Sequence, residues 1–93
     1  MIKQYSFDRA FLGSCGVDMT DLAVTTSGVE DGLTKKAAVQ SSRHKYVVME
    51  REKFYFNESY KYTHFDDISG IITDEFPDDT IVNILRNTGV KLL

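Results

Sequence analysis

The sequence has 93 residues, which suits one small domain, and 42% of them are hydrophobic, enough for a core rather than a disordered tail. Eleven basic and fourteen acidic side chains give a net charge of -3, which argues against the broad basic surface that binding to duplex DNA requires. The apolar runs are far shorter than the roughly 20 residues that cross a bilayer. The single cysteine, Cys15, excludes an internal disulfide, and the N-terminus lacks a signal-peptide pattern. We therefore expect a cytoplasmic protein without a membrane part.

The first third of the chain predicts a strand, a long loop and a helix. Residues 7–12 are short and apolar-rich and stop at Gly13, as a strand that enters a tight loop does. From Gly13 to Gly28 the chain is rich in Gly, Ser, Thr and Asp, so we expect a long loop in which only residues 23–26 extend briefly. Long loops in small domains are often functional.

A helix is expected to begin at Ser27 and to reach about Arg43. Ser27 and Glu30 match a capping box, in which each side chain accepts a hydrogen bond from the backbone amide of the other residue. Apolar residues that recur every four positions indicate an amphipathic helix over this stretch. These residues are Val29, Leu33 and Ala37.

Two more strands are expected in the middle of the chain. Residues 46–49 form a continuous run of β-branched and aromatic type, typical of a strand covered on both faces. Residues 50–57 break that pattern with charges and indicate an irregular loop. Residues 60–64 can pair briefly at the edge of a sheet, and residues 69–73 are a further candidate for a buried strand.

The C-terminal stretch predicts a second helix and a last strand. After Pro77, Asp78 can cap a helix, and Gly89 supplies the left-handed residue at which that helix ends. Residues 90–93 form the last predicted strand.

This order of elements indicates an α/β fold with a mostly parallel, Rossmann-like sheet and helices on its faces, because strands that alternate with helices need crossover connections. No repeat, low-complexity tract or linker interrupts the order, so residues 1–93 are expected to form a single domain. The first strand has no upstream partner in this sequence, and parallel sheets normally carry helices on both faces. We therefore expect these residues to be part of a larger domain.

Ligands of open α/β sheets bind at the carboxyl ends of the strands, so the loops after Leu12, Met49 and Thr73 are the candidate site. In the first loop, glycines let backbone amides approach a ligand, and a carboxylate can accept hydrogen bonds from sugar hydroxyls. The residues concerned are Gly13, Cys15, Gly16 and Asp18. An ordinary turn would have the same composition.

Lys53 follows the second predicted strand, where its ammonium can meet a phosphate or a sugar oxygen. The alternative is a surface ion pair with a neighbouring carboxylate, Glu50 or Glu52. Catalysis by Cys15 is not expected, because nothing places a histidine beside it. A structural metal site is not expected either, since the sequence lacks close ligand spacing such as C-x-x-C.

Residues 7–13 (Phe-Asp-Arg-Ala-Phe-Leu-Gly), followed by Gly16-Val17-Asp18 and Thr25-Thr26, resemble the C-terminal sensor domain of DeoR-type regulators. The later segments that resemble the family are residues 46–48, 53–54, 67–74 and 89–90. No one motif is highly specific, but their order and spacing together cover nearly the whole chain.

The resemblance implies a bacterial regulator with an N-terminal helix-turn-helix and a sensor domain built like ribose-5-phosphate isomerase. On this basis residues 1–93 hold the later part of an effector-sensing domain of a repressor of carbohydrate metabolism, without cofactor. The expected partners are a phosphorylated sugar, DNA through a helix-turn-helix that is absent from these residues, and further copies in a homo-oligomer. The residues expected to bind the effector are Gly13, Cys15, Gly16, Asp18 and Lys53.

The isomerases that this stretch resembles carry an acidic tract that moves protons between an aldose and a ketose. Only its outer acids remain here, as Asp8 and Asp18. The three acids between them are replaced by Leu12, Cys15 and Gly16. Lys35-Lys36 also stands where the isomerases have a Glu-Lys pair. We therefore expect a pocket that binds a sugar phosphate, and not an enzyme.

Two alternatives remain open at this point. A relative of sugar-phosphate isomerases or deaminases would convert ribose 5-phosphate to a ketose. A dimerisation scaffold without ligand, suggested by the aromatic density of residues 54–65, would show no ligand-dependent change in melting temperature.

Overall fold

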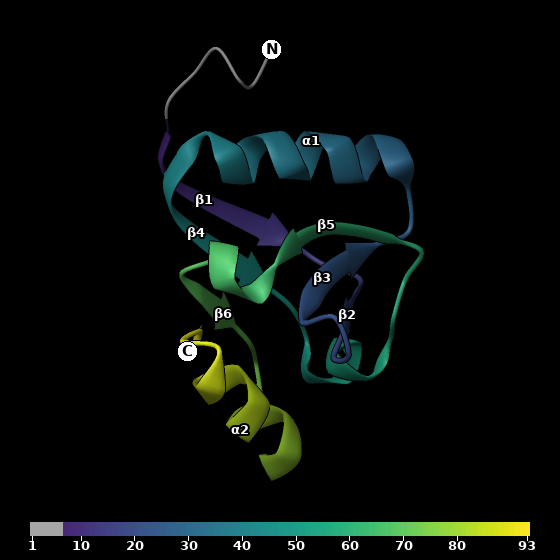
Figure 1. Cartoon of the computed structure of the whole chain (residues 1–93), viewed down its shortest axis with the longest axis vertical. Helices are drawn as coiled ribbons and strands as arrows, with labels where there is room; N and C mark the ends of the chain where they lie inside the picture. The colour runs from purple at the N-terminus through teal and green to yellow at the C-terminus, as the bar shows by residue number, and fades with distance from the viewer. Residues whose placement is uncertain (1–6) are drawn as a thin grey trace.

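The computed structural model describes residues 7–93 and contains two sheets side by side (Figure 1). The larger sheet has four strands in the order β1-β4-β6-β7, all parallel, and the smaller has three antiparallel strands in the order β2-β3-β5. The predicted α/β class with a mostly parallel sheet is confirmed. In Figure 1, α1 and α2 lie at opposite ends of the molecule.

The strands of the parallel sheet are β1 (Phe7–Gly13), β4 (Ser42–Val48), β6 (Gly70–Ile72) and β7 (Lys91–Leu92). All four were predicted, although β4 begins four residues earlier than its apolar run. Pairing with β1 extends β4 toward its amino end, where Ser42 lies opposite Phe7. The first four residues of β4 are polar, so the run of apolar residues that predicted the strand did not include them.

The prediction of a long loop from Gly13 to Gly28 is wrong. This stretch contains β2 (Gly16–Asp18) and β3 (Ala23–Thr26), which pair with each other, and β3 also pairs with β5 (Tyr60–His64). Thr25 and Thr26 are almost fully buried. Their hydroxyls are satisfied there, because Thr25 Oγ1 accepts from Glu58 N at 3.0 Å and Thr26 Oγ1 donates to Asp31 Oδ2 at 2.8 Å. Polar residues that indicated a loop thus form a buried strand.

Helix α1 (Val29–Gln40) confirms the predicted helix, but the capping box is wrong. Gly28 is the N-cap residue, and no side chain caps this end. The helix ends at Gln40 rather than near Arg43, because β4 begins two residues later. The residues buried in the helix are Gly32 and Val39, whereas Val29 and Leu33 are 60% and 54% exposed.

The later elements follow the prediction more closely. The expected loop after β4 contains a short 3-10 helix, η2 (Arg51–Tyr55), and a second one, η3 (Phe65–Asp67), follows β5. Helix α2 (Asp79–Asn87) has the predicted N-cap, Asp78, whose carboxylate accepts from Ile81 N at 3.1 Å. Gly89 has a φ of 81°, as expected for the residue that ends this helix.

One hydrophobic core joins the two sheets and both helices. Its most buried members are Val24, Val47, Phe65, Ile71 and Leu85. Among residues 7–93, no helix has the length and apolar character needed to cross a membrane.

Candidate functional site

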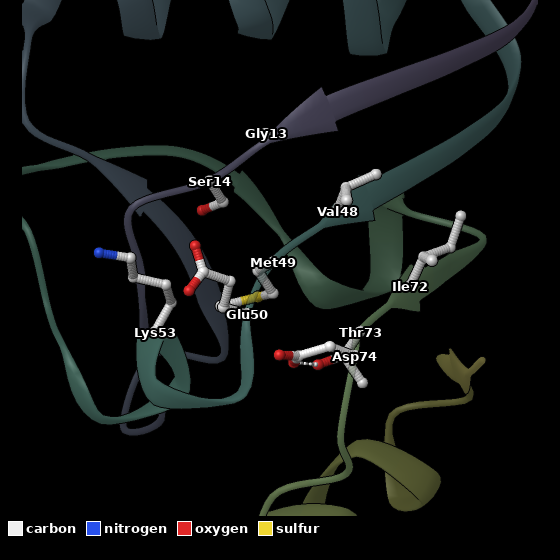
Figure 2. Close-up of a pocket in the computed structure, with 9 residues that line it drawn as sticks. All are labelled: Gly13, Ser14, Val48, Met49, Glu50, Lys53, Ile72, Thr73 and Asp74. Atoms are coloured by element: carbon white, nitrogen blue, oxygen red, sulfur yellow. Dashed lines mark hydrogen bonds between the residues drawn. The ribbon is translucent and has the colours of Figure 1, made fainter.

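A cleft of about 530 Å³ opens at the carboxyl ends of β1, β4 and β6 (Figure 2). This is where three neighbouring parallel strands end, and the predicted loops do meet there. Val48 and Ile72 point to the same side in Figure 2, as their register in the sheet requires. The lining residues are Gly13, Ser14, Val48, Met49, Glu50, Lys53, Ile72, Thr73 and Asp74.

Lys53 is the cationic side chain of the cleft, and η2 positions it. Its ammonium lies 5.4 Å from the centre of the Phe56 ring. Within the described residues it forms no salt bridge, so the alternative of a surface ion pair with Glu50 or Glu52 is not seen there. An ammonium next to a ring face and without a carboxylate partner is free to meet an anionic ligand.

Helix η2 is held against the loop that follows β6. Arg51 N donates to Asp74 Oδ1 at 2.9 Å, and Arg51 Nε donates to the carbonyl oxygen of Phe76 at 3.0 Å. The amide of Arg51, together with that of Glu75, holds the pKa of the Asp74 carboxyl below its usual value. Asp74 is therefore ionised at neutral pH, and its hydrogen bonds join two walls of the cleft.

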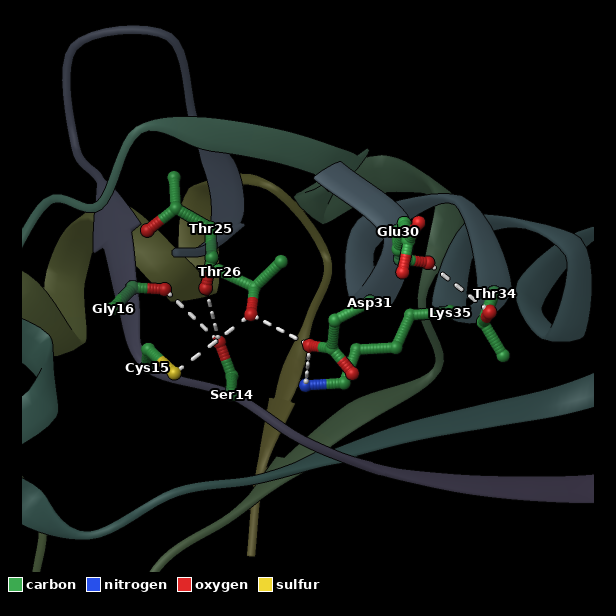
Figure 3. A network of polar contacts seen from close by, with 9 residues as sticks. All are labelled: Ser14, Cys15, Gly16, Thr25, Thr26, Glu30, Asp31, Thr34 and Lys35. Carbon is green, nitrogen blue, oxygen red and sulfur yellow. Dashed lines mark hydrogen bonds and ion pairs between the residues drawn. The ribbon is translucent and has the colours of Figure 1, made fainter. Parts of the chain in front are cut away.

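Ser14 fixes the chain where it leaves β1 (Figure 3). Its amide donates to the carbonyl of Val48 at 3.3 Å, and its hydroxyl lies 2.9 Å from the carbonyl oxygen of Thr25 and 3.1 Å from that of Gly16. Ser14 therefore connects the end of the parallel sheet to the small sheet. Gly13 and Ser14 are the parts of the predicted glycine loop that line the cleft.

Gly16 has a packing role. A Cβ atom at this position would lie 2.3 Å from the carbonyl oxygen of Phe56, and Val17 N donates to that same oxygen at 2.7 Å. The absence of a side chain lets β2 run against the segment after η2. Gly16 does not line the cleft.

Asp18 is the last residue of β2, just before the turn to β3, and it lies outside the cleft lining. Its Oδ1 accepts from the amides of Thr20 and Asp21 at 2.9 and 3.0 Å, and its Oδ2 lies 3.3 Å from the ammonium of Lys61. These contacts, led by the Asp21 amide, lower the pKa of Asp18. The structure thus brings Gly13 and Lys53 together but leaves Asp18 at a distance from them.

Cys15 belongs to a polar network between β1 and α1 rather than to the cleft lining (Figure 3). Its half-buried thiol lies 3.7 Å from Thr26 Oγ1. Thr26 donates to Asp31, which forms a salt bridge with Lys35 at 2.9 Å. The Lys35 ammonium and the Thr26 hydroxyl lower the pKa of Asp31.

Tyr62 is buried behind this network. This residue is 2% exposed, and its hydroxyl has no hydrogen-bond partner within the described residues. Burial raises the pKa of Tyr62, although the nearby Ser14 hydroxyl acts in the opposite direction. This phenol therefore remains protonated at neutral pH.

Sequence reasoning named the three strand ends but not every residue that lines them. Ser14, Glu50, Thr73 and Asp74 each lie at or just after the end of a predicted strand, so their position at the strand ends was the signal that could have found them. The two acids that survive from the isomerase tract, Asp8 and Asp18, do not line the cleft. In residues 7–93, no group of three or more His, Cys, Asp or Glu side chains is placed to hold a metal ion.

Comparison with known proteins places these features in a family. The model of the DeoR C terminal sensor domain matches residues 1–75. The chain is 32% identical over 92 residues to the uncharacterized HTH-type transcriptional regulator FruR of Bacillus subtilis (strain 168), covering 99% of the chain and 36% of that protein. It is 26% identical over 92 residues to the HTH-type transcriptional repressor GlcR of the same organism, covering 99% and 35%.

A third relative is the glycerol-3-phosphate regulon repressor of Escherichia coli (strain K12), which is 25% identical over 91 residues, 98% of the chain and 36% of that protein. The chain thus spans about a third of the length of these relatives. Because the family model covers most of the chain, the protein belongs to the DeoR C-terminal sensor domain family.

Proposed function

We propose that this chain is the ligand-sensing part of a DNA-binding transcriptional repressor of carbohydrate metabolism, and that its effector is a phosphorylated sugar held in the cleft of β1, β4 and β6. Lys53 lines this cleft and its ammonium has no carboxylate partner among residues 7–93, and this observation carries the proposal. DNA binding would come from a separate helix-turn-helix, since the net charge of -3 does not favour DNA. The working protein would be a homo-oligomer in the cytoplasm.

The chemistry of the lining fits a ligand with an anionic end and a hydroxylated end. Lys53 would contact the phosphate as a compact point charge. Glu50, Thr73 and Ser14 would exchange hydrogen bonds with the sugar hydroxyls, because carboxylates accept and hydroxyl groups both accept and donate. Asp74 already accepts from two amides, so it would support the wall more than contact the sugar.

The contact set differs from the one that the sequence suggested. Gly13 and Lys53 stay in it as cleft residues, whereas Cys15, Gly16 and Asp18 have other structural roles in this chain. The names of the relatives support the wider function. Two of them are called repressors, and one name refers to glycerol 3-phosphate.

Thermal shift of the full-length gene product against a panel of sugar phosphates tests the proposal. Binding to the native state alone stabilises it by roughly 2.7 kcal/mol when the ligand is at 100 times its Kd, so the true effector will raise the Tm. We expect no shift from the unphosphorylated sugar at the same concentration. Inorganic phosphate serves as the control for a non-specific anion effect.

Lys53→Ala should remove the shift and leave the Tm without ligand unchanged, because its ammonium has no ion partner to lose within the described residues. The matched control is Lys36→Ala, an exposed lysine on α1 that lies away from the cleft. An unchanged shift in the Lys53 variant would show that the effector binds elsewhere. Conversion of ribose 5-phosphate to a ketose would favour the enzyme alternative instead.

A further inference from the structure

The hydroxyl of Tyr62 is a buried polar group to which the effector cleft gives no role. Tyr62 lies on β5 and is almost completely buried, and its phenol oxygen has no hydrogen-bond partner in residues 7–93. Buried hydroxyls in folded proteins are nearly always hydrogen-bonded, since burial removes their contact with water. An exception of this kind points to a partner that arrives in another state of the protein.

Tyr62 reaches the polar network at the end of β1. On the side of α1, the ammonium of Lys35 lies 5.7 Å from the centre of the Tyr62 ring. On the side of β3, Lys61 lies opposite Thr25, whose carbonyl oxygen is 2.9 Å from the Ser14 hydroxyl (Figure 3). The Ser14 hydroxyl is close enough to the phenol to favour its ionised form, and so acts to lower its pKa against the larger effect of burial.

Most groups of this network already have partners. Asp31 accepts from Thr26 Oγ1 at 2.8 Å and forms a salt bridge with Lys35 at 2.9 Å. The Cys15 thiol, a weak acceptor, contacts Thr26 at 3.7 Å. Ser14 differs from them, because its hydroxyl acts only as a donor among the described residues. A hydroxyl can also accept through two lone pairs, so Ser14 Oγ keeps the capacity to accept from a phenol.

Ser14 lies between the effector cleft and the phenol. It lines the cleft, whereas Tyr62 does not (Figure 2). Its one proton is within reach of the carbonyl oxygens of Thr25 and Gly16, at 2.9 and 3.1 Å. A ligand oxygen in the cleft offers this proton another acceptor. When the proton turns toward the cleft, the lone pairs of Ser14 Oγ turn toward the interior, where the phenol lies.

Building on the effector cleft of the proposed function, we propose that Tyr62 is a positioning residue that acts through Ser14. When an oxygen of the sugar accepts from the Ser14 hydroxyl, the Tyr62 hydroxyl donates to Ser14 Oγ and gains the partner that it lacks in the free protein. Hydrogen bonds that are joined in a chain strengthen one another. The pair would therefore favour sugar phosphates that carry an oxygen beside the end of β1 over those that do not.

Tyr62→Phe in the full-length gene product without ligand tests the first part of this proposal. Removal of an unpartnered hydroxyl from a buried site relieves its desolvation cost, so the urea midpoint should stay equal to that of the parent or rise. Tyr60→Phe is the matched control, because Tyr60 is also on β5, with its ring against Gly32 of α1. A midpoint that falls for Tyr62→Phe and not for Tyr60→Phe would show a hydroxyl already paired in the free protein, and would overturn the proposal.

Calorimetric titration with ribose 5-phosphate, glucose 6-phosphate and glycerol 3-phosphate tests the second part. For each ester that binds the parent through Ser14, Tyr62→Phe should weaken the Kd about three- to tenfold, as expected for one lost hydrogen bond. Tyr60→Phe should leave it unchanged. In a Ser14→Ala background, Tyr62→Phe should have no further effect, because the two hydroxyls act as one unit. If Ser14→Ala does not fold, Ser14→Cys replaces it, since a thiol is a much weaker acceptor.

The outcomes separate this role of Tyr62 from the proposed function. If the parent binds an ester and Tyr62→Phe binds it equally well, the role of Tyr62 is overturned and the effector cleft stands. The same holds if Tyr62→Phe weakens binding as much without the Ser14 hydroxyl as with it, because a structural loss at Tyr62 would not depend on Ser14. If the parent binds the esters no better than inorganic phosphate, the effector cleft itself is contradicted, and the role of Tyr62 falls with it.

Discussion

Gly16 is placed where the backbone of β2 runs against the carbonyl of Phe56. A methyl group at this position would meet that oxygen at 2.3 Å, and because the obstacle is backbone, a segment of chain must move to relieve the contact. Gly16→Ala should therefore lower the free energy of unfolding by roughly 1–3 kcal/mol, the usual cost of forcing extra volume into a packed site. Urea unfolding followed by circular dichroism measures it.

Gly13→Ala is the matched control for this substitution. A Cβ at Gly13 meets nothing within 4 Å, so its stability should stay close to that of the parent chain. Equal losses in the two variants would mean that the β2 contact with Phe56 is not what requires glycine.

Two residues also show the limit of sequence reasoning at this scale. Asp18 and Gly16 were expected at the effector because both follow the first strand, and that spacing cannot distinguish a ligand contact from a turn. Here the Asp18 carboxylate binds the amides of Thr20 and Asp21, and Gly16 relieves a backbone contact. Lys53, by contrast, lies where it was expected, because its position depends only on the end of β4.

In helix α1 the residues that predicted the helix are not the ones that hold it. The four-residue spacing of Val29 and Leu33 gave the correct element, yet both side chains are exposed, and Val39 is buried. Val39→Ala should lower the free energy of unfolding by roughly 1–3 kcal/mol, because it removes buried methyl groups from the core. Leu33→Ala, measured in the same urea series, should cost much less.

A larger loss in the Leu33 variant than in the Val39 variant would contradict this assignment of the faces. The reason that periodicity failed is tertiary. Gly32 faces the Tyr60 ring of β5, and a Cβ atom added to this glycine would lie only 2.1 Å from the ring, so the side that packs is the one with the smallest residue. The spacing of apolar residues cannot reveal a helix face that packs through the close approach of a glycine to a neighbouring ring.

Helix α2 is an element whose cap was readable from the sequence. Asp78 accepts from Ile81 N and from the hydroxyl of Tyr55, so it both caps the helix and connects it to η2. Asp78→Ala should lower the Tm by a few degrees, because loss of an N-cap leaves helix amides without a partner. Thr80→Ala, in the first turn, is the matched control and should change the Tm less. Equal Tm values for the two variants would argue against a capping role.

At the scale of the whole molecule, the parallel sheet followed from the sequence but the second sheet did not. Buried apolar runs and crossovers were sufficient to predict β4, β6 and the parallel sheet. The small sheet depends on pairing between β3 and β5, which are separated by more than thirty positions along the chain, and on threonines that are buried with partners. Pairing between segments so far apart in the sequence cannot be predicted from a short stretch of polar residues.

The carboxylates that organise the turns and helix ends also set the response of the whole molecule to acid. Four of them have a pKa below the ordinary aspartate value of 3.8, chiefly through backbone amides or, for Asp31, through the Lys35 ammonium. These four are Asp18, Asp31, Asp74 and Asp78. A group whose pKa is lower in the folded state stabilises that state fully above its unfolded pKa, and this contribution is lost as the pH falls through the folded value.

The urea midpoint should therefore be constant from neutral pH down to about pH 5 and then fall as the pH drops through 3.8 and below. Unfolding curves at pH 7, 5, 4 and 3 in constant salt measure this. The double variant Asp18→Asn with Asp31→Asn should start from a lower midpoint at pH 7 and decline less, because two of the four titrating groups are removed. A parent midpoint that is the same at pH 3 as at pH 7 would show that these hydrogen bonds do not favour the ionised carboxylates in the folded chain.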